Sequence, residues 1–429
     1  MVSTVLLVLC GAITAPGSFL LPDELLEAQG VQLKAQRPEP GMQLIAKDET
    51  RPKLWYAPVA TRVMEDGVRV WYQRVNSGES EWLDQRTLCV GDIRGGDFLL
   101  PALRDTEPVW GGPNNVCMTR SPHTPTWGGF NVFQIVEQDG ALQMLYWDQP
   151  DEDGQAGVML ATSDDGWQWD KRPGTVFTEH NDAYTVRPHG EAYLLYQTVL
   201  EDWPDKPFAD NLDGKRRVQS LRRSTDLKTW TPQEVILRPD DQDPPEAEFY
   251  LMKTFPYGAG YAGLLMKYYA DPKLEGKHSG IIVNELIASR DGVQWERPYR
   301  DTDIGFWAYA DPFDIGNKTH FVIWKDGGME TVYYSKNRLT GVTSEGDGGF
   351  SLALGANREL PGRLNADTSD GWIELDVIDG NGVVQAGYGQ CRIEKVDGSS
   401  IPLGWKIGKA APDMRLRVRM NAATIFALE

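Results

Sequence analysis

The sequence predicts an all-β protein: a five-bladed β-propeller followed by a small C-terminal β-sandwich-like domain. Three observations lead to this prediction: a repeated hairpin motif, apolar strands that recur about every 60 residues, and 44 Gly and 27 Pro scattered between short apolar runs. Frequent Gly and Pro between short strands are typical of an all-β chain with many tight turns. A chain of 429 residues is too long for one ordinary core, which favours two domains or one large repeat domain with an appendage.

The hairpin motif occurs three times. Each copy has a small polar residue, an Asp in a turn, and a Trp four residues after that Asp: Asp165–Trp169, Asp226–Trp230 and Asp291–Trp295. Asp accepts hydrogen bonds from the backbone N–H groups of its own turn, and Gly takes a positive φ, which is typical of a β-hairpin. A strand–turn–strand unit precedes each copy, so one period holds about four strands, the size of one propeller blade.

The same spacing extends outwards to an earlier blade near residues 68–92 and a later one near 320–334, which makes five. A pair of β-sandwiches with coincidental turn motifs is the alternative. After about residue 340 the pattern changes to alternating strands, with a hairpin turn at Asp379–Gly382. We therefore expect the propeller over residues 16–340 and the C-terminal domain over residues 341–429.

Residues 1–15 form a short apolar run that ends in small residues. This pattern predicts a signal peptide and a secreted or periplasmic protein, although no Lys or Arg precedes the run and a first β-strand is the alternative. Elsewhere no apolar run is long enough to span a membrane.

The composition also limits the partners. The net charge of −19 would repel nucleic acids and anionic membranes, so we expect neither as a partner. The 15 Trp and 16 Tyr suit sugar binding, because flat aromatic faces stack on sugar rings, although most of them are expected in strands and cores.

The four Cys and five His show no zinc-ligand spacing. We expect a monomer without a cofactor, and one structural Ca²⁺ stays an open alternative.

The Ser-x-Asp-Gly-x-x-Trp hairpins in a five-blade count resemble those of the furanosidase-type propeller hydrolases. These are the arabinanase and β-xylosidase family, the invertase and levanase family, and related uncharacterised bacterial proteins. The resemblance is closest to the last group, through Asn114–Val116, Phe255–Gly258 and the tail pattern Leu364–Asp367 with Trp372. It implies a glycoside hydrolase with three carboxylates near the propeller axis: a general acid, a base or nucleophile, and one that tunes a pKa or stabilises the transition state.

By this resemblance the candidate catalytic residues open three different blades. Glu248 opens the fourth blade at the position of the general acid, Asp182 opens the third as the pKa-tuning or stabilising carboxylate, and Asp311 opens the fifth. Each has a structural alternative as a solvated loop or turn carboxylate. The candidate substrate-binding residues lie in the same openings; they are Arg120, Trp127, Asn131, His180, Asn181, Tyr250, Lys253 and Trp307. Trp307 would stack on a sugar, His180 and Asn181 would bind hydroxyls, and the cations would bind a carboxylate or sulfate.

The sequence departs from the family pattern in its first two blades. The opening of the first blade, Lys53–Pro58, has no Asp or Glu where those families keep the base or nucleophile, and the second blade has none either. The leading hypothesis is therefore a glycosidase acting on an oligo- or polysaccharide. A non-catalytic sugar-binding propeller is the alternative from another class, and a sialidase-like or phosphorylase-like enzyme is a third.

Overall fold

The computed structural model describes residues 18, 21–76, 85–103, 114–124, 129–178, 183–206, 212, 214–269, 280–354, 360–405 and 408–429. The described residues form strands β1 to β28 and one short 3-10 helix, Pro22–Glu24, which confirms the all-β prediction. No helix among them has the length and apolarity of a membrane span. The predicted signal peptide, residues 1–15, lies outside the described part.

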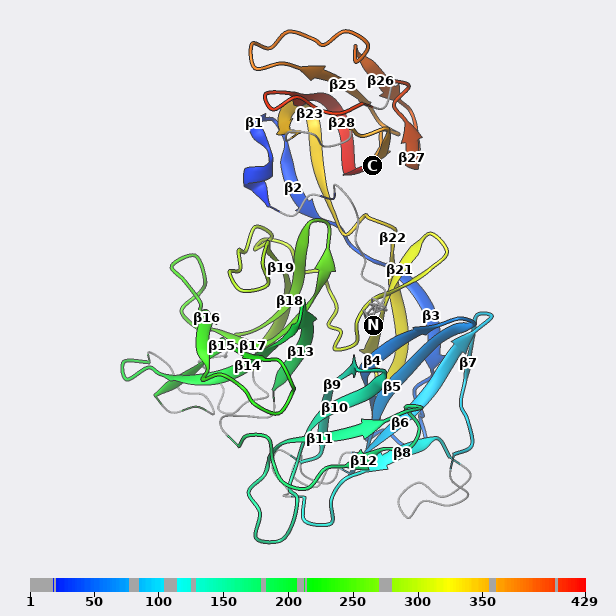
Figure 1. Ribbon diagram of the computed structural model, residues 1–429, viewed down its shortest axis with the longest axis vertical. Helices are drawn as coiled ribbons and strands as arrows, with labels where there is room; N and C mark the ends of the chain where they lie inside the picture. The colour runs from blue at the N-terminus through cyan, green and yellow to red at the C-terminus, as the bar shows by residue number, and fades with distance from the viewer. Residues whose placement is uncertain are drawn as a thin grey trace, which may run out of the picture.

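Five sheets surround a common axis, which confirms the predicted five-bladed propeller (Figure 1). The first blade contains β4 (Leu54–Met64), β5 (Gly67–Asn76), β6 (Gln85–Arg94), β7 (Asp97–Leu99) and β8 (Val116–Thr119). The second contains β9 (Asn131–Gln138), β10 (Ala141–Asp148), β11 (Gly157–Ser163) and β12 (Asp170–Lys171). The third contains β13 (Tyr184–His189), β14 (Ala192–Asp202), β15 (Lys215–Ser224) and β16 (Glu234–Leu237). The innermost strands β4, β9, β13 and β17 contact one another in this order around the axis.

The last two blades are built differently from the second and third. The fourth contains β17 (Ala247–Tyr257), β18 (Gly260–Tyr269) and β19 (Ile281–Ser289). The fifth contains β20 (Phe313–Ile315), β21 (Lys318–Lys325) and β22 (Gly328–Ser335), and its outermost strand is β3 (Glu39–Ile45) from the other end of the chain. The N-terminal segment therefore closes the ring. Gly41 is needed there, because a Cβ at this position would lie 2.6 Å from the carbonyl oxygen of Thr331.

The three sequence motifs link neighbouring blades. In each, one Asp oxygen accepts hydrogen bonds from the backbone N–H groups two and three residues further on, as at Asp165 with Trp167 (2.8 Å) and Gln168 (3.0 Å). The turn carbonyl of Gly166 accepts a bond from Trp71 of the first blade (2.7 Å). The turn of Gly292 likewise accepts one from Tyr196 of the third blade (2.7 Å). The turns at Gly166 and Gly292 thus help to hold neighbouring blades together.

The C-terminal strands form one eight-stranded sheet at one end of the molecule (Figure 1). It contains β23 (Thr340–Ala353), β24 (Arg363–Asp367), β25 (Trp372–Ile378), β26 (Cys391–Glu394), β27 (Asp397–Pro402) and β28 (Arg415–Leu428). Two N-terminal strands, β1 (Leu26–Gln29) and β2 (Gln32–Ala35), pair with β23. The limits 16–340 and 341–429 stay predictions, but these two strands fall in the first range and belong to the second sheet. The sheet encloses its own apolar core, which includes Phe350, Leu375 and Val418.

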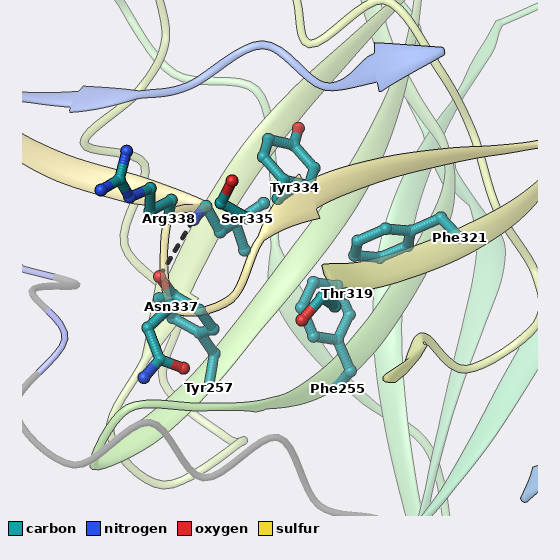
Figure 2. Close-up of a pocket in the computed structure, with 9 residues that line it drawn as sticks. Phe255, Tyr257, Thr319, Phe321, Tyr334, Ser335, Asn337 and Arg338 are labelled. Carbon is teal, nitrogen blue, oxygen red and sulfur yellow. Dashed lines mark hydrogen bonds between the residues drawn. The ribbon is translucent and has the colours of Figure 1, made fainter. Parts of the chain in front are cut away.

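A small pocket lies where the propeller meets this sheet (Figure 2). Phe255 and Phe321 line its apolar side, and the backbone N–H of Leu339 donates to the hydroxyl of Tyr257 at 3.1 Å. Its empty volume is about 230 Å³ with open solvent included. Ligand pockets usually exceed about 300 Å³. The pocket therefore belongs to the joint between the two parts rather than to the candidate site.

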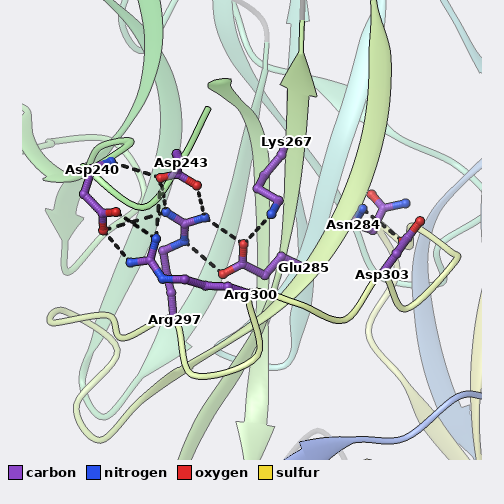
Figure 3. A network of polar contacts seen from close by, with 8 residues as sticks. All are labelled: Asp240, Asp243, Lys267, Asn284, Glu285, Arg297, Arg300 and Asp303. Atoms are coloured by element: carbon purple, nitrogen blue, oxygen red, sulfur yellow. Dashed lines mark hydrogen bonds and ion pairs between the residues drawn. The ribbon is translucent and has the colours of Figure 1, made fainter. Parts of the chain in front are cut away.

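A buried ionic network fastens the outer side of the fourth blade (Figure 3). Arg297 binds Glu285 on β19 at 2.7 Å and also binds Asp243 in the loop before β17. Lys267 on β18 binds the same glutamate at 2.8 Å, and no part of Glu285 is exposed. Because β19 has no fourth strand beside it in the described part of this blade, the network holds the segment after β19 and the loop before β17 in place.

His320 is buried in the fifth blade and gives the fold a pH dependence. Burial lowers its pKa below the usual 6.5; Lys318 adds to this effect and Asp314 opposes it. The unfolded chain then binds the proton more readily, so stability should fall as the pH drops below about 6.5. We expect His320→Gln to reduce this slope, measured as unfolding free energies in urea between pH 7.5 and 5. The exposed His123→Gln should leave it unchanged; equal slopes in wild type and His320→Gln would contradict the prediction.

Candidate active site

One side chain from each of the five blades lies in a polar hub at the propeller axis. Lys253 on β17 donates to Gln134 on β9 (2.9 Å) and pairs with Asp311, which precedes β20 (2.9 Å). Arg187 on β13 binds the same carboxylate oxygen at 3.0 Å. Thr61 on β4 donates its hydroxyl hydrogen to the backbone carbonyl of Asp311 at 2.6 Å. The five blades therefore meet around Asp311, and its carboxylate is held by Lys253 and Arg187.

The charges of the hub keep that carboxylate ionised. Burial alone would raise the pKa of Asp311, but Lys253 and Arg187 outweigh burial and hold the pKa below its usual value. Lys253 is 1 % exposed, and its own pKa is lowered mainly by burial and further by Arg187, while Asp311 opposes the shift. Among the described residues, two cations thus contact one carboxylate at the hub.

Asp311 is held in the hub through one of its two carboxylate oxygens, and its side chain is partly exposed. Oδ1 accepts from both cations, whereas Oδ2 has no hydrogen-bond partner among the described residues. Its side chain is 32 % exposed, although the two cations beside it are almost fully buried. An ionised carboxylate fixed through one oxygen and accessible at the other can act as a base, as a nucleophile or as a stabiliser of positive charge.

Glu248, the predicted general acid, lies in a different environment. It is on β17 but reaches the third blade, where Arg217 on β15 binds one oxygen at 2.6 Å and Lys206 binds the other at 3.1 Å. The residue is 0 % exposed. A carboxylate with both oxygens held by cations and no contact with solvent is the arrangement of a structural ion pair. Its catalytic role stays a prediction, and this geometry does not favour it.

A substitution separates the two roles of Glu248. We expect Glu248→Gln to lower the free energy of unfolding by about 1–3 kcal/mol, because the amide keeps the shape but leaves two buried cations poorly compensated. Chemical denaturation measures this loss. Glu246→Gln, two residues earlier, is the matched control and should change stability little. A stable Glu248→Gln variant that loses turnover would restore the general-acid assignment.

Four of the predicted residues lie outside the described part: Asp182, His180, Asn181 and Trp127. Arg120 is exposed on the loop after β8. Strand β8 pairs with β6 of the first blade, so the second blade begins at Asn131 on β9. Asn131 is buried and accepts a hydrogen bond from Arg86.

The remaining predicted residues lie along the inner strands and the segment before β20. Tyr250 contacts the ring of Tyr268 and lies under the guanidinium of Arg217 at 5.1 Å. Trp307 is partly buried and packs edge-on against Tyr309 at 5.6 Å. Lys253, expected to bind a charged sugar group, instead holds Asp311 and Gln134. Of the eleven predicted residues, the structure thus brings Lys253 and Asp311 into direct contact.

Three hub residues were missed from the sequence: Thr61, Gln134 and Arg187. Two of them carried a signal. Gln134 is a single amide within an apolar run, and Arg187 is a single charge within a short buried strand. A polar side chain on a strand that is buried on both sides needs a partner, which could have marked both as members of a buried polar cluster.

Within the described residues no group of three or more His, Cys, Asp or Glu side chains could hold a metal ion. Cys89, Cys117 and Cys391 are free thiols, the first two buried. The site as described therefore consists of ordinary side chains around Asp311.

No protein-family model matches the chain, and no curated protein matches it by sequence. Three solved structures that are similar to it are carbohydrate-active enzymes, as the sequence resemblance predicted. A family 117 glycoside hydrolase from Zobellia galactanivorans is 11% identical, covers 93% of this chain and 92% of its own, and gives a TM-score of 0.40. A GH32 β-fructofuranosidase from Bombyx mori is 13% identical with coverages of 92% and 94% and a TM-score of 0.42. A β-1,2-mannobiose phosphorylase from Listeria innocua is 9% identical with coverages of 69% and 98% and a TM-score of 0.42.

Proposed function

We propose that the protein is a carbohydrate-active enzyme that cleaves glycosidic bonds of an oligo- or polysaccharide at the propeller axis. One observation supports this most strongly: Asp311 is fixed through one oxygen by Lys253 and Arg187 at the point where the five blades meet, while the rest of its carboxylate stays accessible. Glycosidic cleavage passes through a positively charged, oxocarbenium-like transition state, which an ionised carboxylate stabilises.

In this proposal Asp311 is the base, nucleophile or charge stabiliser and not the proton donor, because its cationic neighbours lower its pKa. A second carboxylate must protonate the leaving oxygen. The sequence assigned that role to Glu248, and it assigned Asp182, which lies outside the described part, as the pKa-tuning or stabilising carboxylate. Lys253 and Arg187 are positioning residues that act through Asp311.

A substrate panel tests the proposal. The wild-type protein is incubated with nitrophenyl furanosides and pyranosides and with plant and marine polysaccharides, each with and without inorganic phosphate. We expect release of nitrophenol or reducing sugar from at least one substrate. Release that requires phosphate and yields a sugar phosphate would identify phosphorolysis in place of hydrolysis. Lack of turnover on the whole panel would count against an enzyme.

A non-catalytic sugar-binding propeller is the second candidate. The burial and double ion pairing of Glu248 support it, because they do not favour catalysis by one of the carboxylates that the sequence assigned to it. Saturable binding of a polysaccharide without any turnover, unchanged by Asp311→Asn, would support this candidate over the enzyme.

A further inference from the structure

Trp324 is an exposed tryptophan held rigidly at the edge of the ring. It lies at the end of β21 and is 52 % exposed. The turn that follows has positive φ at both central residues, Asp326 (49°) and Gly327 (83°), which is the tight two-residue hairpin of type I′. This turn fixes the direction of the strand end, so the side chain is presented to solvent on a rigid support.

A second tryptophan lies beside it at a steep angle. Trp55, the second residue of β4, has its ring centroid 6.5 Å from that of Trp324, and the two planes are 75° apart. The guanidinium of Arg86 lies 6.0 Å from the Trp55 ring and also donates to Asn131. Lys325 and Glu330 form an ion pair at 2.8 Å, but strand alternation places it on the face of the hairpin opposite to Trp324. The guanidinium of Arg86 is therefore the hydrogen-bonding group beside this aromatic corner.

We infer that Trp324, supported by Trp55, is a stacking site for one ring of a saccharide at a distance from Asp311. A sugar ring has an apolar face that stacks on indole and a polar edge that binds hydrogen-bonding groups, and this corner combines indole with the Arg86 guanidinium. A lipid surface fits less well, since the chain carries a net charge of −19.

The position of this corner sets the length of the substrate. Trp55 precedes Thr61 by six residues on β4, and Thr61 binds the backbone of Asp311. At about 3.3 Å per residue this is roughly 20 Å along the strand. We expect a substrate that contacts both this corner and Asp311 to be an oligo- or polysaccharide. This step rests on the proposed function, because it takes Asp311 as the reacting point.

The test compares wild type, Trp324→Ala, Trp324→Phe and Asp311→Asn by calorimetric titration with arabinan, xylan, levan and a marine galactan, and with their oligosaccharides of two to six residues. Trp167→Ala is the control, because Trp167 is a partly exposed tryptophan in a hairpin at the other end of the blade strands. We expect Trp324→Ala to weaken binding of the longest chains about tenfold and the shortest ones less, since one stacking contact contributes about 1 kcal/mol or slightly more. Trp324→Phe should retain most of the affinity, and Trp167→Ala should bind as wild type.

The outcomes distinguish this inference from the proposed catalysis. If long chains bind through Trp324 but wild type turns nothing over, the stacking site stands and the catalytic proposal fails. If wild type is active and Trp324→Ala binds long chains as tightly as wild type, the stacking site is wrong and catalysis stands. Equal losses for short and long chains would also overturn the inference, as would a wild type that binds none of these glycans.

Discussion

Asp311→Asn is expected to lower turnover of the cleaved glycan by roughly 100- to 10,000-fold, the range for loss of a positioned acid–base group. The amide nearly matches the carboxylate in size but supplies neither a base nor a charge to oppose the oxocarbenium-like transition state. Steady-state kinetics on the best substrate of the panel measure the effect, which should appear mainly in kcat because the lost interaction belongs to the transition state.

Two controls keep this result interpretable. Asp314→Asn removes a carboxylate three residues later that pairs with Lys336 at 2.9 Å, and it should retain activity. Asp311→Asn also leaves Lys253 and Arg187 without their counter-charge, so its fold must be checked by circular dichroism. If it unfolds, Asp311→Glu keeps the charge while moving the oxygens and should fold but remain slow. A folded Asp311→Asn variant with wild-type kcat would remove Asp311 from the mechanism.

Arg297→Met is expected to lower the free energy of unfolding by about 3–5 kcal/mol, the largest stability effect that we predict. The arginine neutralises Glu285 and Asp243 in the fourth blade, and Glu285 has no exposed surface (Figure 3). Methionine fills the space but leaves buried carboxylates with fewer partners. Urea denaturation followed by tryptophan fluorescence measures the loss.

The matched control for Arg297 is an exposed arginine in an ion pair. Arg223 binds Glu234 at 3.5 Å on the surface of the third blade, and Arg223→Met should cost less than about 1 kcal/mol. A double variant that also replaces Glu285 by Gln should be less destabilised than the sum of its two single changes, because the two partners interact directly. A loss of less than 1 kcal/mol in Arg297→Met would show that the network contributes little.

The repeated hairpins made the propeller predictable, because each copy contains, within ten residues, both the Asp and the backbone N–H groups that it binds. Asp165 and its counterparts bind the backbone of their own turns, so their geometry is fixed locally. Two other features were not predictable in the same way: ring closure by β3, and the pairing of β1 and β2 with β23 of the C-terminal sheet. Their partners are about 300 residues away, and short strands such as Gln32–Ala35 show no pattern that selects one sheet over another.

Only two of the five hub residues could be predicted, again because the contacts join segments that are far apart in the sequence. The resemblance pointed to Asp311, and the position of Lys253 near a blade opening made it a candidate, but their contact joins segments 58 residues apart. Arg187 and Gln134 come from two further blades. For Glu248 the strand position suggested a catalytic acid, and the sequence did not indicate that its side chain pairs with Lys206 and Arg217 of the third blade.

The central claim is that a saccharide meets the accessible oxygen of Asp311 inside the ring of blades. A crystal structure of the Asp311→Asn variant, soaked with the oligosaccharide that it binds best, tests this most directly. We expect a sugar ring within hydrogen-bond distance of the side chain at position 311, with the rest of the chain running toward Trp324. A sugar bound only elsewhere, with that side chain sealed from solvent, would contradict the account.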